Sequence, residues 1–187
     1  MDKKKTSDEE LVLYIQRHAG AGFEEVIDRY QDKLLRYVAT LCRDRDRTQD
    51  VVQETFISAY QNINSFNTNR KFSSWIYRIA HNKAINEWRK NKNQISLSTI
   101  TEAEGKYNAT EISKEIDQKQ VHLRVKYLIS VLPEKYREPL VLRHFEEKSY
   151  EEISDILKIP KSTVGVRIKR GVAIIKRTSN IKIEDYL

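Results

Sequence analysis

The sequence predicts an all-α protein of two small helical domains joined by a flexible linker, with a helix-turn-helix in the second domain. Three observations lead to this fold class. The 187 residues include only 5 Gly and 3 Pro, too few turn formers for the connections of a many-stranded sheet. Apolar residues recur at helical spacing in both halves of the chain. A polar stretch without period, residues 93–120, separates the halves and is expected to be the linker.

The first domain, residues 8–92, is expected to begin with two helices. A short helix near 8–18 is followed by Gly20-Ala21-Gly22, which interrupts helical spacing. The second helix carries a single apolar stripe, with steps of one, three and four residues, from Phe23 to Leu41. One long amphipathic helix explains this pattern.

Two more helices complete the first domain. Asp46, with Gln49 three residues later, resembles a capping box that opens the third helix. The side expected to be buried in that helix comprises Val51, Val52, Phe56, Tyr60 and Ile63. A polar turn over 62–71 precedes a fourth helix at about 73–90. Its inward face is expected to contain Ile76, Ile79, Ala80, Ala84 and Trp88.

The second domain, residues 121–187, is expected to contain four helices. The first ends at Leu132-Pro133 and includes Leu123, Tyr127, Leu128 and Val131. In the next, Pro139 should kink the first turns or delay the start.

The third and fourth helices of this domain form the helix-turn-helix. Ser149 and Glu152 make a capping box, 158–161 is the turn, and Ser162 is expected to cap the last helix. The residues expected to point inward there are Val164, Ile168, Val172 and Ile175.

Composition argues against several functional classes. No apolar run approaches the roughly 18–20 residues of a membrane span, so we expect no direct membrane insertion. The charged start of the chain lacks the apolar stretch of a secretory signal. The single cysteine, Cys42, and four scattered His residues fit a cytoplasmic protein without a zinc site. No catalytic motif is recognisable, and we expect neither an enzyme nor a cofactor.

Positive charge is concentrated in two places. The chain has 34 basic and 27 acidic residues, a net charge of +7. Residues 158–182 hold eight basic residues and no acid, and residues 67–92 hold seven basic residues against Glu87 alone. Two such clusters suggest two contacts with one polyanion. Two solvated helix faces would give the same pattern with about even odds.

The fourth helix has the residues that a single nucleic-acid strand requires. Arg78, Asn82, Asn86 and Lys90 repeat every four residues, and Trp75 lies just before them. Cations contact phosphates, amides contact base edges, and aromatic rings stack on bases. The alternative is that Trp75 belongs to the core and the amides are ordinary surface residues.

Two other helices carry candidate binding faces. Asp50, Gln53 and Glu54 form an acidic patch on the third helix, which would repel DNA and suits a basic protein partner, unless it serves only solubility. On the last helix the outward residues are expected to contact bases, unless this is a helical hairpin with solvated charges. These residues are Thr163, Val166, Arg167, Lys169 and Arg170.

Together these motifs resemble bacterial sigma factors of the extracytoplasmic-function group, in the sigma-70 family. The stretches 50–56 (DVVQETF) and 72–82 (FSSWIYRIAHN) are similar to the second conserved region of that group. The stretches 132–137 (LPEKYR), 149–153 (SYEEI) and 159–164 (IPKSTV) are similar to the fourth.

The resemblance implies a promoter-specificity subunit of RNA polymerase. Asp50, Gln53 and Glu54 would then dock on the coiled-coil clamp of the largest catalytic subunit of the core polymerase. The loop 64–72 and the fourth helix would melt the −10 element and hold its single strand. The residues implied are Asn67, Arg70, Lys71, Trp75, Arg78, Asn82 and Asn86. For the duplex −35 element they are Thr163, Arg167, Lys169 and Arg170. An anti-sigma factor is also an expected partner.

The chain departs from the group's pattern at one pair of positions, and the length of its linker limits how the two domains can reach both promoter elements. Gly165-Val166 stands where the group commonly has a basic or polar pair, so the −35 sequence cannot be taken from relatives. A coil of the linker's length spans only about 30 Å. Promoter elements about 25 base pairs apart are separated by roughly 85 Å. Polymerase must therefore hold the linker extended.

Two other functional classes remain open from the sequence. One is a stand-alone helix-turn-helix regulator that reads duplex DNA as a dimer, and it would have no use for the aromatic and amide stripe at 72–90. The other is an enzyme that processes nucleic acid, for which no catalytic residues are apparent.

Overall fold

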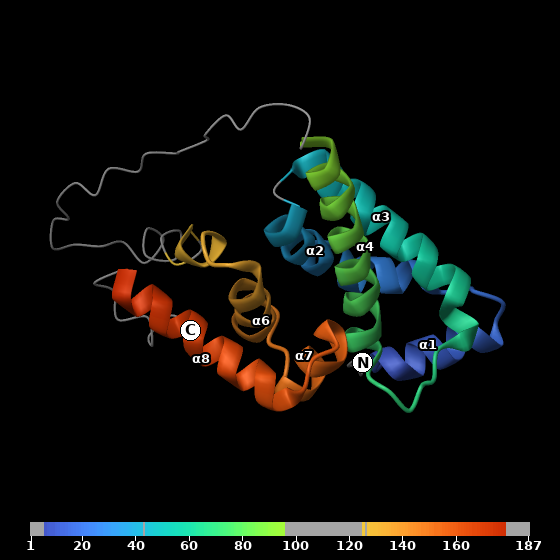
Figure 1. Ribbon diagram of the computed structural model, residues 1–187. Helices are drawn as coiled ribbons and strands as arrows, with labels where there is room; N and C mark the ends of the chain where they lie inside the picture. The colour runs from blue at the N-terminus through green and yellow to red at the C-terminus, as the bar shows by residue number, and fades with distance from the viewer. Residues whose placement is uncertain (1–5, 43, 96–124, 126, 179–187) are drawn as a thin grey trace, which may run out of the picture.

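The computed structural model describes residues 6–42, 44–95, 125 and 127–178, and all regular structure in these ranges is helical (Figure 1). The helices form two bundles, as the all-α prediction with two domains requires. Most of the expected linker, Leu123, and the side chains of Trp88 and Lys90 lie outside the described part.

The first bundle begins with α1 (Asp8–Arg17) and α2 (Phe23–Cys42). Ser7 and Glu10 form a capping box at the start of α1 that satisfies backbone amides otherwise left without partners. The turn between the helices places Gly20 at φ +92°, a conformation that favours glycine. The ring of Tyr60 fills the space beside Gly20, where a Cβ atom would lie 2.6 Å from the Tyr60 hydroxyl oxygen.

The third helix, α3 (Arg45–Asn62), starts earlier than predicted. Asp44, not Asp46, is the N-cap residue, because its carboxylate accepts a hydrogen bond from the amide of Arg47 at 3.0 Å. The prediction that Tyr60 is buried is also wrong: the residue is 49% exposed, since its ring packs on the outer turn at Gly20. Thr55, whose hydroxyl donates to the carbonyl of Val51, is fully buried instead.

A short 3-10 turn, η1 (Ile63–Ser65), and a loop lead to α4 (Phe72–Ile95). The helix extends into the first residues of the expected linker. Ile76, Ala80 and Ala84 lie in the core as predicted, whereas Ile79 is only half-buried. Tyr77, absent from the predicted inward face, is fully buried. It faces the second bundle, a contact that the spacing within α4 does not indicate.

In the second bundle, residues 125 and 127–130 are helical and precede α6 (Glu134–His144). Leu128 is buried, while Tyr127 and Val131 are 46% and 56% exposed. Pro133 is the N-cap of α6, and Pro139 lies inside the helix. The expected delay of the helix start is therefore wrong: α6 begins directly after Pro133 and includes Pro139.

The helix-turn-helix consists of α7 (Tyr150–Leu157) and α8 (Lys161–Thr178). The predicted capping box of Ser149 and Glu152 is confirmed, and Lys158 ends α7 in a left-handed conformation. The capping role predicted for Ser162 is wrong, because α8 begins one residue earlier and contains it. Val164, Ile168 and Ile175 point inward as predicted.

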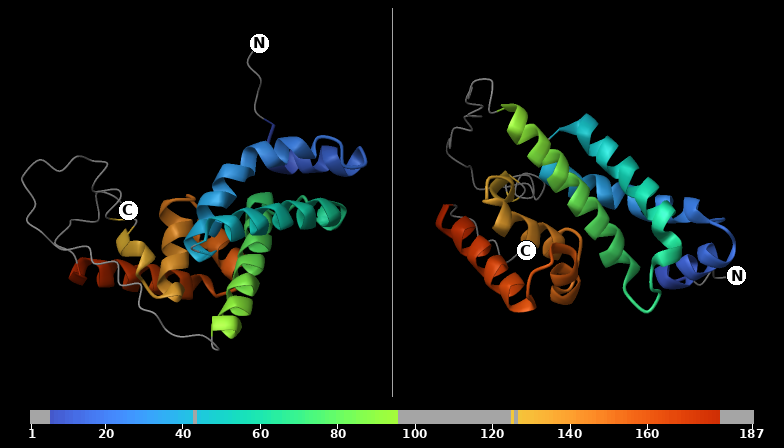
Figure 2. Two further views of the ribbon diagram at one scale, coloured as in Figure 1. Left: turned by 90° about the horizontal axis from the view of Figure 1, so that it is seen from above. Right: turned by 45° about the vertical axis from the view of Figure 1, so that its right-hand side comes forward.

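The two bundles are in contact. The N-terminal half of α4 packs against α7, and α2 packs against α6 (Figures 1 and 2). The end of α4 leaves this contact and points away from the second bundle (Figure 1). The surface of the first bundle that carries Arg78 therefore faces the helix-turn-helix.

Candidate nucleic-acid and protein interfaces

Helix α1 holds the loop that precedes α4. The side-chain amide of Gln16 donates to the carbonyl oxygens of Ile63 and Phe66, at 2.7 and 2.8 Å. The carboxylate of Glu9 accepts the amide hydrogen of Phe72 at 3.0 Å and so caps the start of α4. Both ends of the loop are thereby fixed to α1.

Between these anchors the loop exposes polar side chains. Asn67, Arg70 and Lys71 are all exposed, and the Asn67 side chain accepts a hydrogen bond from the amide of Asn69. This Asx turn keeps the loop tight and directs its cations outward. The loop is thus shaped to offer two cations and an amide to a ligand.

Trp75 is half-buried beside this loop. Its ring centroid lies 5.1 Å from that of Phe66 and 5.5 Å from that of Phe72, both of which are buried. Trp75 therefore packs partly in the core, and it also keeps some surface on which a base could stack. One side of the indole packs on the core while part of the ring remains accessible.

The polar stripe of α4 is divided between two environments. Asn82 and Asn86 are exposed, as a base-reading role requires. Arg78, one turn before Asn82, has a side chain that is only 23% exposed. Its guanidinium donates to the carboxylate of Asp155 on α7 at 3.1 Å. Of the three described residues of the stripe, Arg78 is thus engaged by the second bundle.

The acidic patch on α3 is exposed at all three positions, Asp50, Gln53 and Glu54. Lys83 of α4 donates to Glu54 at 3.3 Å. A polar groove of about 480 Å³ follows the α3–α4 boundary and is lined by Arg47, Asp50, Val51, Glu54, Lys83, Asn86, Glu87 and Arg89. The patch therefore borders the end of the polar stripe at Asn86.

Beside the patch lies a second, apolar groove. It occupies about 740 Å³ between α2 and α3 and contains Gln53 at its border. Ile57 is 49% exposed there. Its lining is Phe23, Ile27, Gln31, Leu35, Gln49, Val52, Gln53, Phe56, Ile57, Tyr60 and Gln61. An apolar surface next to carboxylates suits a protein partner better than DNA.

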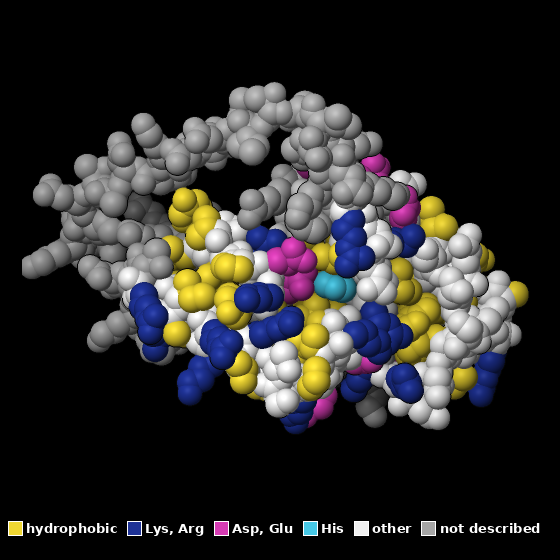
Figure 3. Space-filling model, viewed as in Figure 1, with side chains coloured by type: hydrophobic (Ala, Val, Ile, Leu, Met, Phe, Trp, Pro, Cys, Tyr) yellow, Lys and Arg dark blue, Asp and Glu magenta, His cyan; other side chains and the backbone are white. Residues whose placement is uncertain are grey.

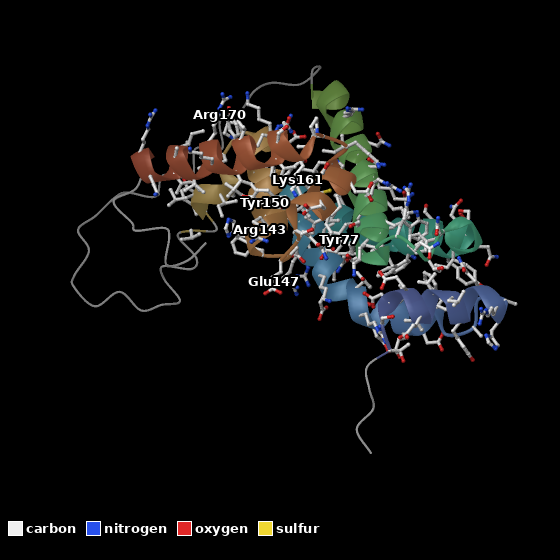
Figure 4. All side chains as sticks on the ribbon, turned by 90° about the horizontal axis from the view of Figure 1, so that it is seen from below. Tyr77, Arg143, Glu147, Tyr150, Lys161 and Arg170 are labelled. Carbon is white, nitrogen blue, oxygen red and sulfur yellow. The ribbon has the colours of Figure 1, made fainter. Side chains whose placement is uncertain are left out.

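The outer face of α8 is rich in cations. Figure 3 shows Lys and Arg side chains gathered over this helix, and Figure 4 shows Lys161 and Arg170 along it. Lys169 and Arg170 are exposed, whereas Thr163 and Arg167 are half-buried. Val166 is 48% exposed. The four residues implied for the −35 element thus form an exposed pair, Lys169 and Arg170, and a half-buried pair, Thr163 and Arg167.

The departure at Gly165 has a structural counterpart. A Cβ atom there would lie 3.4 Å from the ring of Tyr150, the first residue of α7. Arg143 of α6 lies over the same ring, with its guanidinium carbon 5.7 Å from the centroid (Figure 4). Tyr150 therefore covers the helix surface that Gly165 leaves bare. In the sequence, Gly165 was the only indication that another side chain packs closely there.

Sequence reasoning missed a polar cluster buried between the bundles. The hydroxyl of Tyr77 donates to the carboxylate of Glu146 at 2.5 Å, and the ammonium of Lys148 lies 4.4 Å from the Tyr77 ring centroid. Nearby, His81 Nδ1 lies 3.8 Å from a carboxylate oxygen of Glu138. All but Lys148 and His81 are less than 9% exposed.

Burial dominates the electrostatics of this cluster. It raises the pKa of Glu138 to about 8 and lowers the pKa of His81 to about 4. Burial also raises the pKa of Glu146, against the opposing hydrogen bond from Tyr77. At neutral pH the neutral forms of Glu138 and His81 are therefore favoured, and the pair is not an ion pair.

Among the described residues, no helix is long and apolar enough to cross a membrane. In the same ranges no group of three or more His, Cys, Asp and Glu side chains is arranged to hold a metal ion.

Comparisons with known proteins cover both bundles. Residues 26–94 match the family model of Sigma-70 region 2, and residues 122–175 match that of Sigma-70, region 4. The chain is 35% identical over 164 residues to the ECF RNA polymerase sigma factor SigW of Bacillus subtilis, covering 83% of this chain and 88% of that protein. It is 32% identical over 172 residues to the RNA polymerase sigma-H factor of Pseudomonas aeruginosa, covering 88% and 89%.

A solved structure shows the same fold. The sigma factor RpoE, in its co-crystal structure with the anti-sigma factor NepR from Bartonella quintana, superposes with a TM-score of 0.69 at 19% identity. The match covers 86% of this chain and 98% of that chain.

Proposed function

The chain belongs to the extracytoplasmic-function (ECF) group of the sigma-70 family, and from that premise we propose that it binds core RNA polymerase, recognises promoter DNA and starts transcription. The observation that carries this function is the presence of both family regions in one chain, each with its expected surface. Region 2 carries the amide and cation stripe of α4, and region 4 carries the cationic face of α8.

Polymerase docking is assigned to the acidic patch Asp50, Gln53 and Glu54. Because the patch is exposed, its carboxylates are available to a basic partner. The apolar groove next to Gln53 adds apolar surface that a partner on the same face would bury. Charge complementarity would steer the encounter, while burial in the groove would supply affinity. We propose that the coiled-coil clamp of the largest polymerase subunit occupies this face.

The single-stranded −10 element is assigned to the loop before α4 and to the stripe along it. Arg70 and Lys71 lie where they can contact phosphates, and Trp75 has an accessible part on which a base can stack. Asn82 and Asn86 offer amide groups to base edges. Asn67 and Arg78 complete the proposed set.

The duplex −35 element is assigned to α8 in the major groove. Exposed Lys169 and Arg170 are the proposed base-reading cations, and half-buried Arg167 is proposed to contact phosphate. Thr163 lies on the first turn and half-exposed, where it can reach a base or the backbone.

The remaining expectations follow from this function. An initiation subunit contributes binding rather than chemistry, so we propose no catalytic activity of its own. We propose that it acts in the cytoplasm, because its partners there would be polymerase and the promoter DNA. An anti-sigma factor is a further proposed partner; the similar fold of RpoE is seen in complex with one.

Reconstitution tests the proposal. The purified chain is mixed with its cognate core polymerase, applied to a size-exclusion column and assayed for run-off transcripts from a defined promoter. Co-elution together with transcripts that require the chain is the expected result. A chain that fails to co-elute and binds duplex DNA tightly by itself would instead be a stand-alone regulator.

A further inference from the structure

The contact between α4 and α7 pairs Arg78, a proposed strand-binding residue, and the neighbouring Ser73 with acids. Arg78 donates to Asp155 at 3.1 Å, and the hydroxyl of Ser73, just over one turn earlier, donates to Glu152 at 3.0 Å. Asp155 is also hydrogen-bonded by Lys158 at 2.7 Å. One acidic face of α7 therefore lies on the start of the α4 stripe.

The charge at this contact imitates that of DNA. Burial alone would raise the pKa of Asp155, but the Lys158 hydrogen bond and the charges of Arg78 and Arg70 hold the pKa below its usual value. Asp155 thus remains ionised between two cations assigned to the −10 strand. A phosphate bound to Arg78 would have to take the place of this carboxylate.

Elsewhere in the described interface between the two bundles, some buried polar atoms have no hydrogen-bond partner. Tyr77 and Glu146 are buried across it, and His81 lies against Glu138. Within the described residues, one carboxylate oxygen of Glu138 and one of Glu146 accept no hydrogen bond, and the Glu146 oxygen has only the Arg36 Nε of α2 at 3.8 Å as an ionic partner. Such groups lower the stability of the closed arrangement, so the contact can be reopened.

The closed arrangement also conflicts with simultaneous binding of both promoter elements. In contact, the Arg78 surface faces α7 of the helix-turn-helix, whereas elements about 25 base pairs apart are separated by roughly 85 Å. The bundles must separate before both elements are bound. The acids on α7 would then leave α4.

We propose that the acidic face of α7, Glu152 and Asp155, is an internal shield on the start of α4 that competes with single-stranded DNA for Arg78 in the free chain. This inference rests on the proposed function of α4 as the strand-binding surface. It assigns to the first helix of the helix-turn-helix a regulatory role besides its structural one. Promoter melting by the free chain is thereby suppressed until polymerase separates the bundles.

The test compares two neutralising changes in the full-length chain. Asp155→Asn removes the acid that contacts Arg78. Glu151→Gln removes the same charge from the same helix, but Glu151 is exposed and paired with Lys161 of its own bundle. Affinity is measured by fluorescence anisotropy with a short fluorescein-labelled single-stranded DNA of randomised sequence. Asp155→Asn should bind about threefold more tightly than the parent chain, and Glu151→Gln should not.

A distance measurement tests the opening itself. Fluorophores are attached in a Cys42→Ser chain at Gln61→Cys and Ala173→Cys, two exposed positions on α3 and α8. Energy transfer should fall in the Asp155→Asn chain and stay unchanged in the Glu151→Gln chain. Equal effects of the two changes on affinity, or no effect of Asp155→Asn, would overturn the shield.

Transcription with core polymerase separates the two possible failures. If the Asp155→Asn chain directs run-off transcripts as the parent does while its strand affinity is unchanged, the shield is wrong and the proposed function stands. If neither chain directs transcripts, the proposed function itself is wrong. Arg78→Gln in the Asp155→Asn chain should abolish the gained affinity, which ties the gain to the shielded cation.

Discussion

Glu9 of α1 accepts a hydrogen bond from the amide of Phe72, 63 residues further along the chain, and so fixes the start of α4. Gln16 of the same helix holds the carbonyls of Ile63 and Phe66. The first helix thus supports the loop that we propose to bind the single strand, although none of its residues was a candidate site residue.

Gln16→Ala should loosen this loop. The Phe66 carbonyl loses the Gln16 donor, and the Ile63 carbonyl keeps only the amide of Phe66, which should lower the free energy of unfolding by about 1–3 kcal/mol. Amides at 64–71 should exchange hydrogen faster, because the loop opens without global unfolding. Urea unfolding and hydrogen exchange measure the two effects, with Gln61→Ala, an exposed amide on α3, as the control. Unchanged exchange in the loop would show that Gln16 does not support it.

The docking assignment is tested by reversing charge. Asp50→Lys together with Glu54→Lys places cations against a basic clamp, so polymerase affinity should be lost. Both positions are exposed, and the circular dichroism melt should therefore change little. Asp28→Lys with Asp32→Lys makes the same charge change one turn apart on the exposed side of α2 and should leave the affinity intact. Equal loss in both double variants would remove the assignment to α3.

Asn82→Ala tests base reading by α4. Losing a base-edge contact worth about 1–3 kcal/mol should reduce the yield of heparin-resistant open complexes on an intact promoter. On a template mismatched around the start site the defect should shrink but persist, because melting is no longer needed while the unpaired base is still read. Asn62→Ala, an exposed amide at the end of α3 that lines neither groove, is the control. A normal yield on the intact promoter would contradict the role.

The two arginines of α8 should behave differently. Exposed Arg170→Ala should cost about 1–3 kcal/mol and flatten the preference at one base position. Half-buried Arg167→Ala should weaken all sequences alike and reduce the salt slope by about one ion. Selection of −35 sequences with the reconstituted polymerase measures both. A motif altered only by Arg167→Ala would reverse the assignment, and a motif altered by neither would indicate reading of DNA shape.

Closure of the two bundles should depend on pH. With a pKa of about 8 in the closed form against an ordinary 4.5, Glu138 favours closure below pH 4.5 and loses that contribution as the pH rises to 8. His81, with a pKa of about 4 against 6.5, favours closure above pH 6.5 and loses its contribution as the pH falls to 4. The two effects oppose each other between pH 4.5 and 6.5. From pH 6.5 to 8 only the carboxyl effect remains, and Glu146, whose pKa burial also raises, acts in the same direction.

Energy transfer between the labels at positions 61 and 173 should therefore fall from pH 6.5 to 8, with the closing constant decreasing by up to about tenfold per pH unit. Glu138→Gln should flatten this dependence, whereas Glu151→Gln, which neutralises an exposed acid on α7, should not. The same slope in Glu138→Gln would exclude Glu138 as its source. The titratable or charged groups facing Glu138 are Tyr37 of α2, His81 of α4, Glu134 and Arg137 of α6, and Arg167 of α8.

Local features of the fold were predictable because short-range chemistry determines them. The α7 capping box needs only Ser149 and Glu152, and its prediction is confirmed. The start of α3 was misplaced because Asp44 and Asp46 are both able to cap a helix, and only the position of the Arg47 amide decides between them. The prediction that Ser162 is the cap failed because the carbonyl of Pro160 already accepts the amide hydrogen of Val164 at 3.1 Å, so the helix begins at Lys161.

Long-range contacts were not predictable in the same way. Helical spacing places Arg78 on the polar stripe with Asn82, but its partner Asp155 is 77 residues away on another helix. Tyr77 likewise reads as one more residue of α4, and only its contacts with Tyr37 of α2 and with Glu146 of the second bundle show why it is buried. No period within either helix encodes which faces of two bundles meet.

The central claim is that this chain, bound to polymerase, opens promoter DNA. The most direct measurement is permanganate reactivity of thymines around the start site, on a linear promoter fragment with core polymerase, with the chain, and with both. Reactive thymines should appear on the non-template strand only with both proteins, and Asn82→Ala should weaken them. Reactivity with core polymerase alone, or none with both proteins despite tight duplex binding by the chain, would contradict the account.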